Sequence, residues 1–300
     1  MKQLLRYLSW AWGTSWPLYA ATVLATNVIG ATAVATFLRF LIPLPSAREL
    51  TSLNTTTATL YLSYFGVAVV AGIAMTLYFF APVLRWQRNP QAYDPNMVRD
   101  LVLRIPLLQT ITGIVLWGIG VVLFTVVAWR YSTEWGVTVA VTATLGGMMV
   151  SLMTYMEAER LVRPVAAKAL AKGAPDHSRL SPLSHRLMTT WALTSAVPVL
   201  GMVLLLFAVA TDFYPEDSRG IIPALLALAI TTLLTGFMGT TLFSMAVADP
   251  IRELQYAINR VRRGQVNTDV RIYDSSEIGV LQAGFNEMMR GLQERQRVSD

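Results

Sequence analysis

The fold is decided by the stretch Asp249-Pro250-Ile251-Arg252-Glu253-Leu254 and the residues after it, which follow directly on a long apolar run. Apolar residues then recur at alternating intervals of three and four, in two series. The first series is Ile251, Leu254, Ile258 and Val261, and the second is Ile278, Leu281, Phe285, Met288 and Leu292. This is the spacing of the a and d positions of a coiled coil, so two helices with apolar seams are predicted.

A polar connector with Gly264, Val266 and Val270 separates the two predicted helices. Pro250 stands where the chain leaves the apolar run, Glu277-Ile278-Gly279 opens the second helix, and Phe285-Asn286-Glu287-Met288 lies within it. In these features residues 249–298 resemble a HAMP domain, the parallel two-helix relay that joins membrane segments to output domains. The resemblance implies that both apolar series, together with Pro250, Gly264, Val266, Val270, Glu277 and Gly279, form the relay site.

The residues before this stretch, 1–248, have the composition of a polytopic membrane domain. The chain is 54% hydrophobic and only 14% charged, which does not suit one soluble domain with a single core. Six apolar runs are long enough to cross a bilayer: Trp16 to Leu41, Thr57 to Leu84, Ile105 to Trp129, Trp135 to Met156, Leu187 to Thr211 and Ile221 to Val247. The predicted fold class is therefore all-α, a six-helix transmembrane bundle followed by a cytoplasmic HAMP coiled coil.

The basic residues predict the orientation of the spans. Twenty of the 24 lysines and arginines fall on the side that holds both termini, and the rule that cytoplasmic loops are basic places both termini in the cytoplasm. We therefore expect a multi-pass protein of the cell membrane. The net charge of +6 is explained by this topology, with anionic lipid headgroups as partners and no need for nucleic acid. The absence of cysteine excludes disulfides and thiolate metal sites.

Motifs for catalysis are missing from these residues. We find no phosphate-binding loop, no nucleophile motif and no paired aspartates for two-metal chemistry, so no catalytic residue and no cofactor is assigned here. One outer loop gathers Asp212, Glu216 and Asp217, whose carboxylates are suitable ligands for a divalent cation. A solvated acidic rim is the alternative interpretation, and the sequence favours it.

A HAMP-like segment of this length has too little core to stand alone, so a parallel homodimer is expected. The six spans, the short outer loops, the HAMP segment and the charged end Glu294-Arg295-Gln296-Arg297 resemble the membrane-bound class III adenylate cyclases of actinobacteria, mycobacteria in particular. The resemblance implies that residues 299–300 begin a linker to an output domain. That domain would convert ATP to cyclic AMP and pyrophosphate with Mg²⁺ or Mn²⁺. The sensor without an outer domain favours a lipophilic ligand.

Two other functions remain open at this stage. A sensor histidine kinase or similar transducer also uses a HAMP relay, and would continue with a helix that bears a phospho-accepting histidine. A transporter or channel with a dimerising tail belongs to another class. The scarcity of ionisable residues in the central turns of the spans argues against it.

Overall fold

The computed structural model describes residues 16–42, 55–170, 183–213, 221–265, 269–270, 272 and 277–299. Within these ranges the chain contains helices and no strand, which confirms the predicted all-α class. The α-helices are α2 (Trp16–Thr36), α4 (Thr55–Arg88), α5 (Pro95–Trp129), α6 (Thr133–Leu170), α7 (Leu183–Trp191), α8 (Val197–Ala210), α9 (Ile222–Arg262) and α10 (Glu277–Ser299). Two π-helical turns, η1 (Phe37–Leu41) and η4 (Ala192–Ala196), and a 3₁₀ turn, η2 (Pro90–Ala92), complete the described elements.

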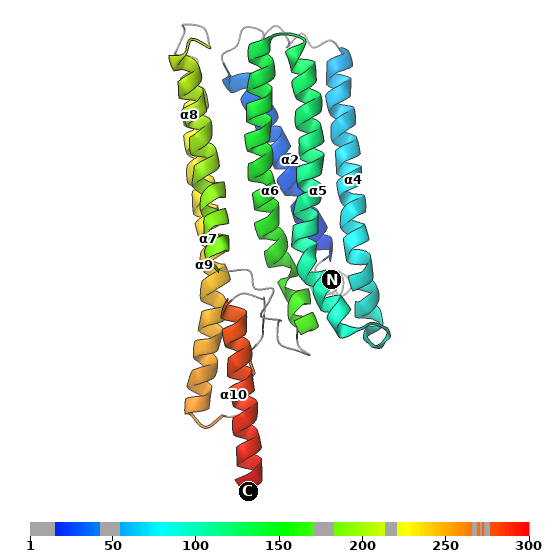
Figure 1. Ribbon diagram of the computed structural model, residues 1–300, viewed down its shortest axis with the longest axis vertical. Helices are drawn as coiled ribbons and strands as arrows, with labels where there is room; N and C mark the ends of the chain where they lie inside the picture. Colours follow the sequence, from blue (N-terminus) through cyan, green and yellow to red (C-terminus); the bar gives the residue numbers. More distant parts are fainter. Residues whose placement is uncertain are drawn as a thin grey trace, which may run out of the picture.

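The six predicted membrane spans are confirmed by helices that are long and apolar enough to cross a bilayer. Their limits are Trp16–Leu41, Thr59–Arg88, Asp100–Trp129, Thr133–Val162, Leu187–Ala210 and Ile222–Arg262. The helices α4, α5 and α6 continue past the apolar runs at the end nearer α10 (Figure 1). The last span has no end at residue 248, because α9 passes without interruption into the predicted HAMP segment.

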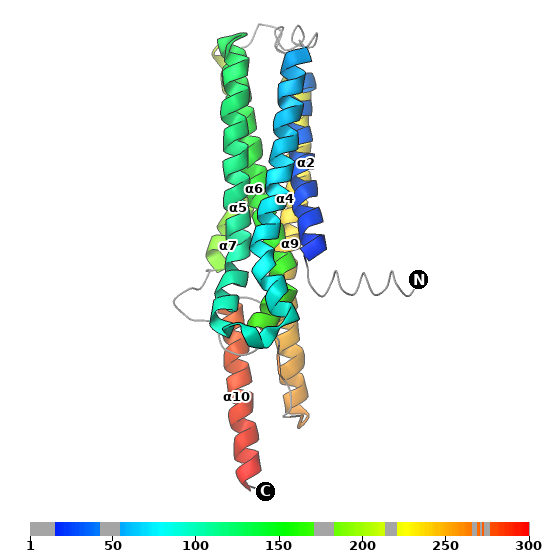
Figure 2. The ribbon, with the colours of Figure 1, turned by 90° about the vertical axis from the view of Figure 1, so that its right-hand side faces the viewer.

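The helices form two groups. Helices α2, α4, α5 and α6 pack together as a bundle, and α8 and α9 form a hairpin beside it (Figures 1 and 2). The bundle has its main core at the end nearer α10, where Tyr19, Phe80, Val102 and Val165 are fully buried. At the opposite end a smaller cluster, which includes Leu205 and Ala224, joins the hairpin to η1 and α6. Nearer the HAMP segment the hairpin also contacts α6, where Arg160 donates to the sulfur of Met245 at 3.5 Å.

Helices α2 and α6 interlock through two glycines. A Cβ atom at Gly30 of α2 would overlap with Val150 of α6, and one at Gly146 of α6 would overlap with Val34 of α2. Each glycine lies four residues from the valine of its own helix, so in this antiparallel pair each valine fits over the partner's glycine. Small residues of this kind let transmembrane helix backbones approach closely, which matters because lipid supplies no hydrophobic force between helices.

We predict that Gly30→Ala destabilises the bundle by about 1–3 kcal/mol, the usual cost of overpacking a well-packed contact. Thermal unfolding in detergent, followed by circular dichroism, should show a lower midpoint. Gly118→Ala is the matched control, because nothing lies within 4 Å of the added Cβ. Val150→Ala, which removes the colliding methyl groups, should rescue Gly30→Ala. An unchanged midpoint for Gly30→Ala would contradict the interlock.

Candidate functional site

The candidate site is the helical relay formed by the second half of α9, the connector and α10. Helix α9 passes through Pro250 without a break, although proline cannot donate the hydrogen bond to the carbonyl four residues earlier. Pro250 is buried, and it follows the apolar part of the helix directly. The position that the sequence marks as the membrane exit is therefore a weakened point inside one continuous helix.

The end of α9 is fixed by Gly264. The amide of Gly264 donates to the carbonyl of Val261 at 2.9 Å, and the amide of Gln265 donates to the carbonyl of Arg260 at 3.1 Å. These two bonds form a Schellman motif, which requires a left-handed residue at its turn. Gly264 has a φ of +84°, which glycine adopts without strain. The sequence-predicted connector glycine thus terminates the helix, while Val266 lies outside the described residues.

The connector is held against α10 by Asn286, a residue outside the predicted relay site. Asn286 of α10 accepts a hydrogen bond from the amide of Val270 at 2.9 Å and donates one to its carbonyl at 2.8 Å. One side-chain amide thereby satisfies both backbone groups of a buried residue. The sequence feature that could have indicated this role lies in Phe285-Asn286-Glu287-Met288, where a side-chain amide stands beside the apolar seam.

Part of each predicted seam packs within the protomer. Leu254 and Ala257 of α9, Val270 of the connector, and Phe285 and Met289 of α10 are buried together, with Val261 packed against them. Helices α9 and α10 run parallel in both views (Figures 1 and 2). Of these core residues, Ala257 and Met289 lie next to the predicted seam positions. Gly279 and Gln282 of α10 are buried too.

The other part of each seam remains exposed in the protomer. On α9 these residues are Ile251 and Ile258, and on α10 they are Leu281, Met288 and Leu292. Ile278 is half-buried, and Glu277 is exposed at the start of α10. Each relay helix therefore presents two adjoining apolar faces, one that packs on its neighbour in the same chain and one that the described part of the protomer leaves exposed.

A polar network crosses the transmembrane bundle. Trp117 of α5 donates to Asn27 of α2 at 3.1 Å, and Asn27 donates to Thr154 of α6 at 3.4 Å. Close by, Thr26 of α2 donates to the carboxylate of Glu157 of α6 at 2.5 Å. Polar groups inside a bilayer are costly unless they bond to each other, so this network ties three helices together. The sequence analysis did not predict this network. Asn27, a polar residue that interrupts an apolar run, is the sequence feature that could have indicated it.

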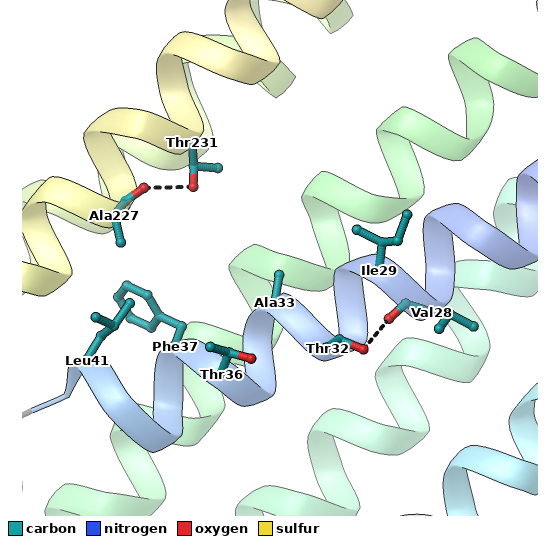
Figure 3. Close-up of a pocket in the computed structure, with 9 residues that line it drawn as sticks. All are labelled: Val28, Ile29, Thr32, Ala33, Thr36, Phe37, Leu41, Ala227 and Thr231. Carbon is teal, nitrogen blue, oxygen red and sulfur yellow. Dashed lines mark hydrogen bonds between the residues drawn. The ribbon is translucent and has the colours of Figure 1, made fainter.

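A cavity of about 470 Å³ lies between the bundle and the hairpin (Figure 3). Its lining is mostly aliphatic and comes from α2, η1 and α9: Val28, Ile29, Thr32, Ala33, Thr36, Phe37, Leu41, Ala227 and Thr231. The hydroxyls of Thr32 and Thr231 donate to carbonyls of their own helices at 2.8 Å. These two hydroxyl groups therefore need no hydrogen-bond acceptor from a molecule in the cavity.

The candidate cation site in the outer loop stays a prediction. Asp212 is exposed in the turn after α8 and has a φ of +54°, a conformation that aspartate tolerates. Glu216 and Asp217 lie outside the described residues. In the part of the chain that the structure describes, no three His, Cys, Asp or Glu side chains gather as metal ligands do.

The fold and the relay define the class of this chain. Residues 242–294 match the HAMP domain family. This range contains all the relay residues described above, from Pro250 to Leu292. The chain is thus a multi-pass membrane protein with a HAMP domain, the arrangement of a membrane signal-transducing module.

The chain is similar to proteins of mycobacteria that are described as uncharacterized. It is 32% identical to Rv1319c of Mycobacterium tuberculosis over 217 residues, 72% of this chain and 40% of that protein. It is 29% identical to Rv1320c of the same species over 284 residues, 94% of this chain and 49% of that protein. The chain therefore spans about half the length of these relatives or less. No solved structure matches it.

We predict that Asn286→Ala loosens the connector, because it leaves the buried amide and carbonyl of Val270 without partners, at a cost of about 1–3 kcal/mol. Trypsin has targets at Arg263 and Arg271 beside and within the connector, so limited proteolysis there should become faster. Asn259→Ala, which removes an exposed amide from α9, should leave the cleavage rate unchanged. Equal rates in the two variants would show that Asn286 does not hold the connector.

Proposed function

We propose that the chain is the membrane sensory and regulatory part of an adenylate cyclase. It would relay a signal through a dimeric HAMP coiled coil to a C-terminal domain that makes cyclic AMP from ATP. The observation that carries the relay is the unbroken helix α9, which links the transmembrane hairpin to the HAMP core. The six-span architecture with a HAMP domain resembles that of mycobacterial cyclases, and the greater length of the uncharacterized mycobacterial relatives leaves room for an output domain. Mg²⁺ or Mn²⁺ would belong to that output domain.

The proposed working unit is a parallel homodimer. HAMP domains are typically dimeric, and the described relay core is small, with only five buried apolar residues. The exposed apolar residues Ile251, Ile258, Leu281 and Met288 would complete a four-helix core if a second copy met them. Dimerisation would thus remove from water the face that a single chain leaves uncovered.

The proposed orientation places both termini and the HAMP domain in the cytoplasm. The excess of arginine and lysine on that side supports it, and so does the role of a HAMP domain as a link to cytoplasmic outputs. Anionic lipid headgroups would meet the basic residues at this surface.

A lipophilic molecule is the proposed class of input. The cavity between α2 and α9 supports this, because its lining is mostly apolar and two of its three threonines, Thr32 and Thr231, bond within their own helices. A molecule bound there would contact α9 at Ala227 and Thr231, on the same helix that enters the HAMP domain. Its binding energy would then act directly on the relay helix.

We predict that the full-length protein, reconstituted with ATP and Mg²⁺ or Mn²⁺, forms cyclic AMP and pyrophosphate. The products are measured by chromatography. Labelled phosphate retained on the protein, with no cyclic AMP, would favour the histidine kinase alternative and contradict the proposal.

The same assay with fatty acids tests the cavity as the input site. Ala227→Phe fills the cavity and should reduce the response to fatty acids, while basal activity remains. Leu234→Phe is the control, because Leu234 is exposed on α9 and does not line the cavity. Equal responses in the two variants would exclude the cavity as the input site.

We predict symmetric disulfides between copies when Ile251 or Leu281 is replaced by cysteine, because both side chains lie on the exposed seam. Crosslinking is measured on gels after mild oxidation in membranes. Asn259→Cys and Glu287→Cys, exposed but outside the two apolar series, should crosslink poorly. Absence of seam crosslinks would refute the HAMP dimer.

A further inference from the structure

One side of α9 stays uncovered along the whole helix and repeats with the period of the HAMP seam. Counting back from Ile258 and Ile251 in steps of seven residues reaches Ser244, Phe237 and Ile230, and all of these are exposed. The exposed fraction is 55% for Ile230, 77% for Phe237, 39% for Ile251 and 43% for Ile258. We name these five residues the a series of α9.

A second series, spaced by three and four residues from the first, changes its environment along the helix. Leu226, Leu233 and Thr240 are exposed, Val247 is half-buried, and Leu254 is buried in the HAMP core. Within the membrane both series therefore lie on one open face. Beyond it only the a series stays open, because α10 covers the other.

The intramolecular contacts of α9 lie on its other sides. A Cβ at Gly239 would overlap with Thr194 of η4, Ala224 is buried in the cluster that joins the hairpin to the bundle, and Thr231 lines the cavity. These positions are roughly a third of a turn or more from the a series. Pro250 is buried as well, so it does not interrupt the open face.

We propose that the transmembrane half of α9 packs against α9 of a second copy through Ile230, Phe237 and Ser244 of the a series and through Leu226, Leu233 and Thr240. This inference rests on the proposed HAMP dimer. Exposed apolar side chains in a bilayer do not by themselves indicate a partner, because lipid is equally apolar. The second copy is selected by continuity, since a seam of seven-residue period runs through one unbroken helix from membrane to HAMP domain.

The side chains nearest the HAMP domain suit a close pair of helices. Thr240 and Ser244 are small, exposed and four residues apart, the spacing at which small residues allow transmembrane helices to approach. Two α9 helices that meet at Ile251 would therefore remain in contact for at least two further turns into the bilayer. The two α9 helices would lie at the centre of the dimer, with each four-helix bundle outside them.

The test is a cysteine scan of α9 from residue 226 to 245 in membranes, with Ile258→Cys as the reference for the HAMP dimer. The chain contains no cysteine, so residues 1–300 need no background substitutions. Disulfide formation requires Cβ atoms about 3.5–4.5 Å apart. We expect Phe237→Cys and Ser244→Cys to crosslink at least about fivefold more than Leu234→Cys and Met238→Cys, which are exposed on the adjoining side of the helix.

Each outcome decides between the two dimer contacts. Crosslinks at Ile258 together with a seven-residue period from 230 to 244 support the continuous seam. Crosslinks at Ile258 with none at Phe237 and Ser244, or with equal yields at Leu234 and Met238, overturn the membrane contact and leave the HAMP dimer intact. Failure at Ile258 as well removes the HAMP dimer and the inference built on it.

Discussion

The continuity of α9 is the constraint on which the rest of the structure depends. A helix of 41 residues crosses the apolar region and enters the HAMP domain without a break, so its membrane half and its HAMP half are joined directly through the weakened point at Pro250. The rest of the chain holds this helix along its length. At the end far from the HAMP segment it joins the cluster around Leu205 and Ala224, in its middle it packs on α8 and η4, and beyond Pro250 Leu254 and Ala257 pack on α10.

The transmembrane bundle has a larger buried core than the HAMP segment. Helices α2, α4, α5 and α6 share a large buried core, interlocked glycines and a polar network, so they form a fixed reference. The HAMP core is smaller, with five buried apolar residues in the part that the structure describes. On the proposed function, a displacement that enters through the hairpin would be taken up more in the smaller HAMP core than in the bundle.

The sequence predicted the features that depend on local pattern. Six apolar runs follow from hydrophobicity and appear as helices in the structure. The two apolar series lie on α9 and α10, and Gly264, which the sequence placed only in the connector, ends α9. Hydropathy alone placed the end of the last span near Val247, but the helix continues because its seam resumes at Ile251. The pairing of Gly30 with Val150 and of Asn27 with Trp117 joins distant spans, which no local pattern specifies. Which residues of each seam are buried within the protomer and which stay exposed depends on the connector that Asn286 holds. This too is a tertiary effect.

On the proposed function, the division of the seams would let one helix serve both as a structural element and as a switch. In the membrane both series of α9 face outward, whereas in the HAMP domain Leu254 turns to α10 and Ile251 and Ile258 remain outside. On this proposal a small rotation of α9 would exchange burial between adjoining apolar faces and expose no polar backbone, so the two packings would differ little in free energy. Bistability of this kind requires faces of similar apolar character. The alternation of isoleucine and leucine at Ile251, Leu254 and Ile258 supplies it.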